Sequence, residues 1–164
     1  MKTKSLTILG INPGTRYFAL VVLRDGNLMD WRIKAFNGKW SEEKLRKARA
    51  IISNFIKIYQ PNILAFKSLH PSRNSNNLKK LERKIFEIGK ENQVKFRQYS
   101  IQEIESFLSP GRRINKRTLS EMIVSQYPIL QPELHLEQRN KSSYYVRMFV
   151  AVAVATLAQV QISR

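Results

Sequence analysis

The chain has no cysteine, and its 164 residues include only 12 acidic side chains against 29 lysines and arginines. Without cysteine there is neither a disulfide framework nor a thiolate metal site. The formal net charge is +17, and this excess indicates a polyanionic partner. Nucleic acid is the commonest such partner of a folded basic domain, and an anionic membrane surface is the main competitor.

Long hydrophobic runs are also missing. The longest apolar stretch, from Met148 to Ala158, is interrupted by Thr156 and is too short to span a bilayer. The start, Met1 to Leu6, carries two lysines but is followed by only a short apolar run before Gly10, so no signal peptide is expected. We therefore expect a soluble, cytoplasmic protein with no membrane partner, associated with the nucleoid if it binds DNA. Apolar residues make up 43% of the chain and can fill one core, which predicts a single domain over residues 1–164.

The first 36 residues predict an antiparallel three-strand meander. Residues 6–11 form an apolar, β-branched run that stops at Asn12-Pro13-Gly14. Two further strand-like runs, 17–23 and 28–36, are separated by the turn sequence Asp25-Gly26-Asn27.

Helices and strands alternate in the rest of the chain. Ser41 is a predicted N-cap for an amphipathic helix that ends near Tyr59. Further strands are expected at 63–66 and 94–99, and further helices at 78–92, at 101–108, from Asn115 or Thr118 to Pro128, and from Ser142 or Ser143 to Val160. This order predicts an α/β fold with a mixed five-stranded sheet, in which parallel strands extend the meander and helices cover both faces. It is the element order of the ribonuclease H-like fold.

Two passages carry a closer resemblance. The opening Ile8-Leu9-Gly10-Ile11-Asn12-Pro13-Gly14-Thr15-Arg16 and the later Val150-Ala151-Val152-Ala153 resemble the first strand and the last catalytic helix of RuvC-type Holliday-junction resolvases. These ribonuclease H-like nucleases cut four-way DNA junctions, and the usual forms of the two motifs are Gly-Ile-Asp-Pro-Gly-Ser and Asp-Ala-Leu-Ala. Resolvases of this type act as dimers, so the resemblance also implies a homodimer.

The resemblance implies a site that normally consists of acids, because two Mg²⁺ ions about 4 Å apart need oxygen ligands. It places Asn12, Lys67, Arg147 and Val150 at the positions of those acids, and none of the four is acidic. No Asp or Glu occurs from Asn140 onwards, so a shift in register supplies none. We therefore expect no cofactor and no ordinary two-metal cleavage. A Lys or Arg in the pocket would bind a DNA phosphate directly.

Other residues keep metal chemistry open. Asn12 could ligate a metal, but a turn before Pro13 is the favoured role. His70 could be a general base or a ligand, but a local cap of the strand before it is favoured. Glu133, His135 and Glu137 alternate as on one side of a strand and could hold a metal, but a solvated connection is favoured.

Basic residues gather in several clusters that can contact phosphates, and the helix at 79–84 could instead be a solvated face. We expect Arg73 and the stretch 112–117 to flank the pocket, and Tyr144 and Tyr145 to stack on exposed bases. The candidate nucleic-acid contacts are Arg16, Lys67, Arg73, Lys79, Lys80, Arg83, Arg112, Arg113, Lys116, Arg117, Lys141 and Arg147.

Three functional hypotheses follow. The first is a protein that binds branched or structured DNA, in preference to RNA, without ordinary nuclease activity. The second is an active, divergent junction endonuclease that uses Mg²⁺ with ligands such as Asn12, His70 or Glu82, or with carboxylates supplied by a partner. The third is an RNA-binding or scaffold protein.

Overall fold

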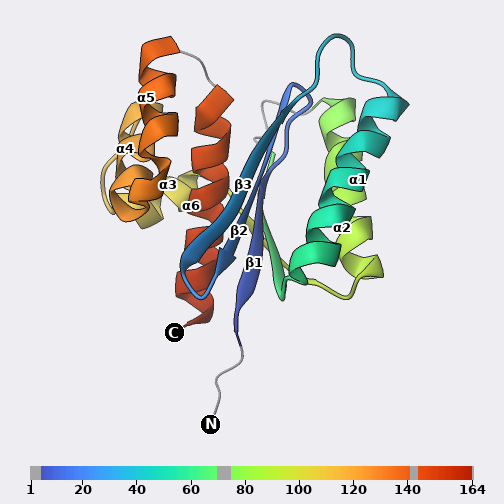
Figure 1. The fold of residues 1–164 in the computed structure, drawn as a ribbon, viewed down its shortest axis with the longest axis horizontal. Coiled ribbons are helices and arrows are strands. Elements are labelled where there is room, and N and C mark those ends of the chain that lie inside the picture. The colour runs from blue at the N-terminus through green and yellow to red at the C-terminus, as the bar shows by residue number, and fades with distance from the viewer. Residues whose placement is uncertain (1–4, 70–74, 141–143, 164) are drawn as a thin grey trace.

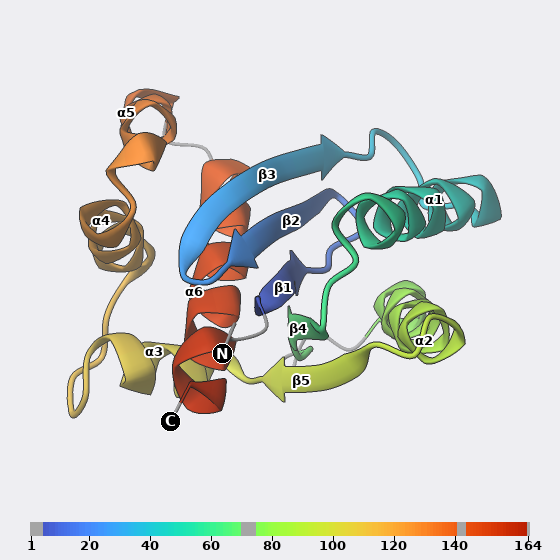
Figure 2. The same ribbon diagram turned by 60° about the horizontal axis from the view of Figure 1, so that its bottom comes forward.

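The structure, a computed structural model, describes residues 5–69, 75–140 and 144–163. Within them, five strands form one sheet in the order β3-β2-β1-β4-β5 (Figures 1 and 2). The neighbours β1, β2 and β3 are antiparallel, and β4 and β5 run parallel to β1. The predicted mixed five-stranded α/β sheet is therefore confirmed. The strands are β1 (Thr7–Asn12), β2 (Tyr17–Arg24), β3 (Asn27–Ala35), β4 (Ile63–Lys67) and β5 (Lys95–Tyr99).

Helices cover both faces of this sheet, as expected. Figure 1 shows α1 and α2 against one face and α6 against the other, with α3, α4 and α5 packed outside α6. The helices are α1 (Glu42–Tyr59), α2 (Asn76–Glu91), α3 (Ile101–Leu108), α4 (Lys116–Gln126), α5 (Gln131–Asn140) and α6 (Tyr144–Ile162), with a short 3₁₀ turn at Pro128–Leu130.

Side-chain caps fix where four of these helices begin. Ser41, Ser75, Ser100 and Asn115 each accept a hydrogen bond from a backbone N–H three residues further on. Such caps satisfy N–H groups that have no partner inside the helix. The Asn115 carboxamide accepts from the Thr118 N–H, so Asn115, and not Thr118, is the cap of α4.

α6 packs closely on the centre of the sheet. Its Ala151 and Ala155 lie directly over Gly10 of β1, where a larger residue would not fit. By length and composition alone this 19-residue helix could cross a membrane. It is longer than the apolar stretch from Met148 to Ala158, which was judged too short to span a bilayer. Most of α6 is buried against the sheet and α3–α5, and this packing accounts for its apolar surface.

The expectation for residues 133–137 was wrong, because this segment is neither an extended strand nor a solvated connection. It lies in α5, whose first turn accommodates Pro132. The core-facing positions Leu130, Leu134 and Glu137 have helical spacing. Because Glu137 is charged, it interrupts the apolar helical pattern. The alternation of Glu133, His135 and Glu137 therefore resembled that of an extended strand. On a helix, positions two apart point in different directions, so Glu133, His135 and Glu137 do not share one side.

Candidate nucleic-acid interface

The candidate site lies where two parallel strands end together. Ile11 of β1 is paired with Phe66 of β4, and each strand ends one residue later, at Asn12 and at Lys67. Side chains alternate between the two faces of a sheet. Because Ile11 and Phe66 face the α1–α2 layer, Asn12 and Lys67 both lie on the α6 face.

Asn12 is tied to the first turns of α6. Its side-chain amide donates to the carbonyl oxygen of Arg147 over 3.1 Å, which joins the end of β1 to α6. The residue is only 2% exposed, and its buried Oδ1 atom has no hydrogen-bond partner among the described residues. A buried carbonyl without a partner is costly, so this atom is suited to a bound water, cation or donor group. The favoured turn role is thus incomplete, because the side chain also fastens β1 to α6.

The side chain of Arg147 extends toward the loop after β1. A Cβ built on Gly14 would lie 3.5 Å from the Arg147 Nη1 atom and only 2.3 Å from the backbone oxygen of Tyr17. Gly14 therefore keeps the β1–β2 turn tight, and the guanidinium lies against this turn. One turn further along α6, Ala151 faces Gly10. Val150 is 7% exposed and belongs to the core, so it adds no polar group.

We call Asn12, Lys67 and Arg147 the strand-end cluster. It combines two cationic side chains with one neutral amide, beside the N-terminal turns of a long helix. The helix dipole adds positive potential there. The described residues contain no group of three or more Asp, Glu or His side chains that could hold a metal ion. Two of the three members of the cluster thus carry a charge opposite to that of the carboxylates that hold metal ions.

Aromatic rings border the strand-end cluster. The rings of Tyr17 and Tyr144 meet edge to face with 5.4 Å between centroids, and Tyr144 meets Tyr145 in the same way at 4.9 Å. The exposed Arg16 holds its guanidinium over the Tyr17 ring, 5.3 Å from the centroid. Burial, together with the two neighbouring phenols, raises the pKa of Tyr144. Tyr17 was missed in the sequence because it has the pattern of an ordinary strand residue, although its place at the start of β2, three residues after Gly14, was a usable signal.

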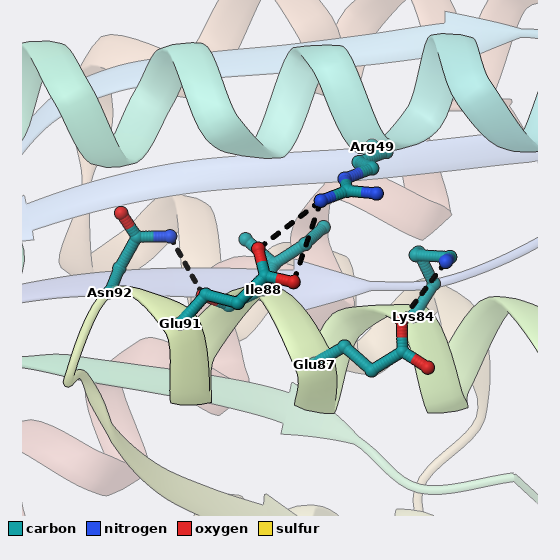
Figure 3. Close-up of polar contacts among 6 residues, drawn as sticks. All are labelled: Arg49, Lys84, Glu87, Ile88, Glu91 and Asn92. Carbon is teal, nitrogen blue, oxygen red and sulfur yellow. Dashed lines mark hydrogen bonds and ion pairs between the residues drawn. The ribbon is translucent and has the colours of Figure 1, made fainter.

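The basic residues of α2 lie in the layer on the opposite face of the sheet, and some are neutralised there. Lys80 lies 3.8 Å from Glu42 of α1. Figure 3 shows two further ion pairs of this layer, Arg49 with Glu91 at 3.2 Å and Lys84 with Glu87 at 2.9 Å. The exposed Lys79 and Arg83 have no ion pair among the described residues. Glu82, a suggested metal ligand, also belongs to α2 and is thus separated by the sheet from Asn12.

The remaining predicted nucleic-acid contacts lie in different parts of the structure or outside the residues that it describes. Arg112 and Arg113 lie in the loop after α3, and Lys116 and Arg117 begin α4; all four are exposed, and Arg117 pairs with Glu121 at 3.0 Å. They belong to the helical layer on the α6 side, and their contact with nucleic acid stays a prediction. His70, Arg73 and Lys141 lie outside the described residues.

The three members of the rejected α5 metal site have separate environments. Glu133 accepts a hydrogen bond from the Trp31 indole over 3.1 Å, and His135 is exposed. Glu137 is 8% exposed and accepts from the Ser120 hydroxyl over 3.2 Å. Burial raises the pKa of Glu137, and the Ser120 hydrogen bond offsets only part of that rise. Glu133 and Glu137 thus hold α5 against β3 and against α4, respectively.

Replacing Glu137 by glutamine is expected to stabilise the protein at neutral pH by on the order of 1 kcal/mol. A carboxyl whose pKa is raised on folding favours the folded state at low pH, and that contribution is lost as the pH rises through the folded pKa. The gain of Glu137→Gln should therefore grow from acidic to neutral pH in thermal unfolding. The exposed Glu43→Gln is the control; an advantage of Glu137→Gln that is the same at every pH would contradict the prediction.

Comparison with solved structures places this arrangement in a known fold. The chain superposes on RuvC of Thermus thermophilus with a TM-score of 0.73 and 15% identity over 96% of both chains. For T. thermophilus RuvC in complex with a Holliday junction substrate the TM-score is 0.70, with 17% identity and 96% of both chains covered. The chain has the fold of a RuvC-type resolvase. The yeast mitochondrial Holliday junction resolvase Ydc2 is also similar, with a TM-score of 0.64 and 12% identity over 96% of this chain and 81% of that one.

The RuvC-type fold is evident from the structure and not from overall sequence similarity. No protein-family model matches the chain, and no curated protein matches it by sequence. At 12–17% identity, these likenesses establish the resolvase fold and leave the chemistry to the residues of this chain.

Proposed function

We propose that this protein binds branched or structured DNA through its phosphates and lacks ordinary two-metal nuclease activity. The resolvase fold supports the first part, since a protein of this fold has been solved with a Holliday junction. The net charge of +17 supports an electrostatic mode of binding.

The observation that carries the proposal is the composition of the strand-end cluster. Lys67 and Arg147 contribute two positive charges where a pair of Mg²⁺ ions would need negative ligands, so they oppose metal binding and attract phosphate. Arg147 can donate two parallel hydrogen bonds to phosphate oxygens, and such charge-assisted bonds are strong. The cluster binds the DNA phosphate directly, which metal ions would otherwise do, and it does not activate water.

The catalytic part is tested by incubating labelled four-way junctions with the purified protein in Mg²⁺ and in Mn²⁺. We expect binding without cleavage. Junction cleavage that copurifies with the protein and is lost in the Asn12→Ala variant would refute the proposal. Lys57→Ala is the control, because Lys57 lies in the last turn of α1, away from the cluster.

The binding part predicts a steep dependence on salt. For duplex DNA, the logarithm of the affinity falls by about 0.9 per neutralised phosphate for each unit of log salt. Measuring junction affinity by fluorescence anisotropy across a salt series gives this slope, and a flat profile would exclude phosphate-driven binding. Competition among junction, duplex and structured RNA in the same assay tests the preference for branched DNA; a preference for RNA would favour the RNA-binding alternative.

One feature favours a second candidate, a divergent junction nuclease. Within the part of the chain that the structure describes, the buried Oδ1 of Asn12 has no hydrogen-bond partner, and an oxygen atom of this kind is a possible metal ligand. If this alternative holds, Mg²⁺ or Mn²⁺ should raise the unfolding temperature of the wild type and have no effect on Asn12→Ala. Our proposal predicts the same unfolding temperature with and without either ion.

A further inference from the structure

We infer that Tyr17, with Arg16 over its ring, is a stacking platform for an unpaired nucleobase whose backbone phosphate is bound by the strand-end cluster. This inference rests on the proposed function and narrows its ligand. It assigns the protein a preference for nucleotides that have left a duplex, such as those of a bulge or an opened branch point.

The platform and the cluster both border the turn that follows β1. Gly14 lies between them, because the Arg147 guanidinium and the backbone oxygen of Tyr17 both lie against it. Tyr144 precedes Arg147 by one turn of α6, and its ring touches that of Tyr17. A base on Tyr17 and its phosphate near Arg147 would therefore belong to the same nucleotide or to adjacent ones.

The three tyrosines meet edge to face and are not stacked face to face. The Tyr17–Tyr144 and Tyr144–Tyr145 pairs have interplanar angles of 82° and 87°. In an edge-to-face pair, the ring that offers its edge keeps both of its faces uncovered by the other. All three tyrosines are partly exposed. The three side chains thus contact one another through their edges while part of each stays accessible to solvent.

Arg16 gives this platform its selectivity for nucleic acid. Its side chain is exposed and rests on Tyr17, and its carbonyl oxygen accepts a hydrogen bond from the Phe36 N–H. The planar guanidinium can stack on a base or move aside to a phosphate while the base takes its place on the ring. The first arrangement adds a cation–π contribution to stacking, and the second adds a charge-assisted contact with a phosphate.

The wild-type protein tests the inference with three DNA duplexes of the same sequence. One carries a single unpaired adenine, one carries an abasic spacer at that position, and one is fully paired. We expect the adenine duplex to bind about tenfold more tightly than the abasic duplex, which is the effect of stacking one base. Equal affinity for these two duplexes would overturn the inference. Failure of all three duplexes and of a four-way junction to bind would instead refute the proposed function.

A Tyr17→Leu variant tests whether the Tyr17 ring is the one that stacks on the unpaired base. The ratio of adenine to abasic affinity should fall to about one in this variant, whereas Phe86→Leu, an exposed aromatic on the opposite layer, should retain the wild-type ratio. A ratio that survives in Tyr17→Leu, or falls equally in Phe86→Leu, overturns the assignment. Should Tyr17→Leu fail to fold, 2-aminopurine at the unpaired position of the wild-type complex decides, because stacking quenches its fluorescence and unchanged emission overturns the inference.

Discussion

Replacing Arg147 by glutamine is expected to weaken the binding of four-way junction DNA by 10-fold or more at moderate salt, on the order of a lost charge-assisted hydrogen bond. The guanidinium lies against Gly14 in the turn after β1, two residues beyond Asn12 at the end of that strand. Asn12 bonds to the backbone oxygen of Arg147 and not to its side chain, so that connection survives the substitution.

The same variant should change the salt dependence of binding. Loss of one phosphate contact lowers the slope of log affinity against log salt by about 0.9. Arg49→Gln removes the same formal charge from the α1–α2 layer, where Arg49 is paired with Glu91, and it should alter affinity by less than about threefold. Equal losses in the two variants would show that only net charge matters and that the strand-end cluster is not a specific phosphate site.

Replacing Gly10 by alanine is expected to destabilise the fold by about 3 kcal/mol, near the upper end of the range for overpacking a core. The added methyl group would lie 2.6 Å from the backbone oxygen of Ala151 and 2.9 Å from the Ala155 Cβ. Neither atom belongs to a flexible side chain, so α6 itself must move away from β1. That movement would also carry Arg147 away from Asn12.

Thermal unfolding measures this effect, and a decrease of about 6–12 °C corresponds to it for a chain of this size. Gly111→Ala is the control: this glycine has open space around it but a φ of 76°, so its substitution should cost only about 1 kcal/mol. A Gly10→Ala variant no less stable than Gly111→Ala would contradict the close packing of α6 on β1.

Most of the fold could be predicted because its signals are local. Apolar runs that stop at turn sequences gave the strands, and Ser41 marked the start of α1, as its cap confirms. The prediction failed at α5, because the buried position at Glu137 is filled by a carboxyl group that interrupts the helical apolar pattern. Its partner Ser120 lies 17 residues earlier in the chain, and such pairings have no local signal.

The site could be predicted only in part. The sequence by itself determined the excess of positive charge, the absence of acids after Asn140, and the identities of Asn12, Lys67 and Arg147. Only the tertiary structure decided that these three residues share one end and one face of the sheet, that Val150 belongs to the core, and that Tyr17 meets Tyr144 beside them. The physical reason is that composition and local pattern follow from neighbours along the chain, whereas the site is formed by strand register and by the packing of α6, which join residues as far apart as 12 and 147.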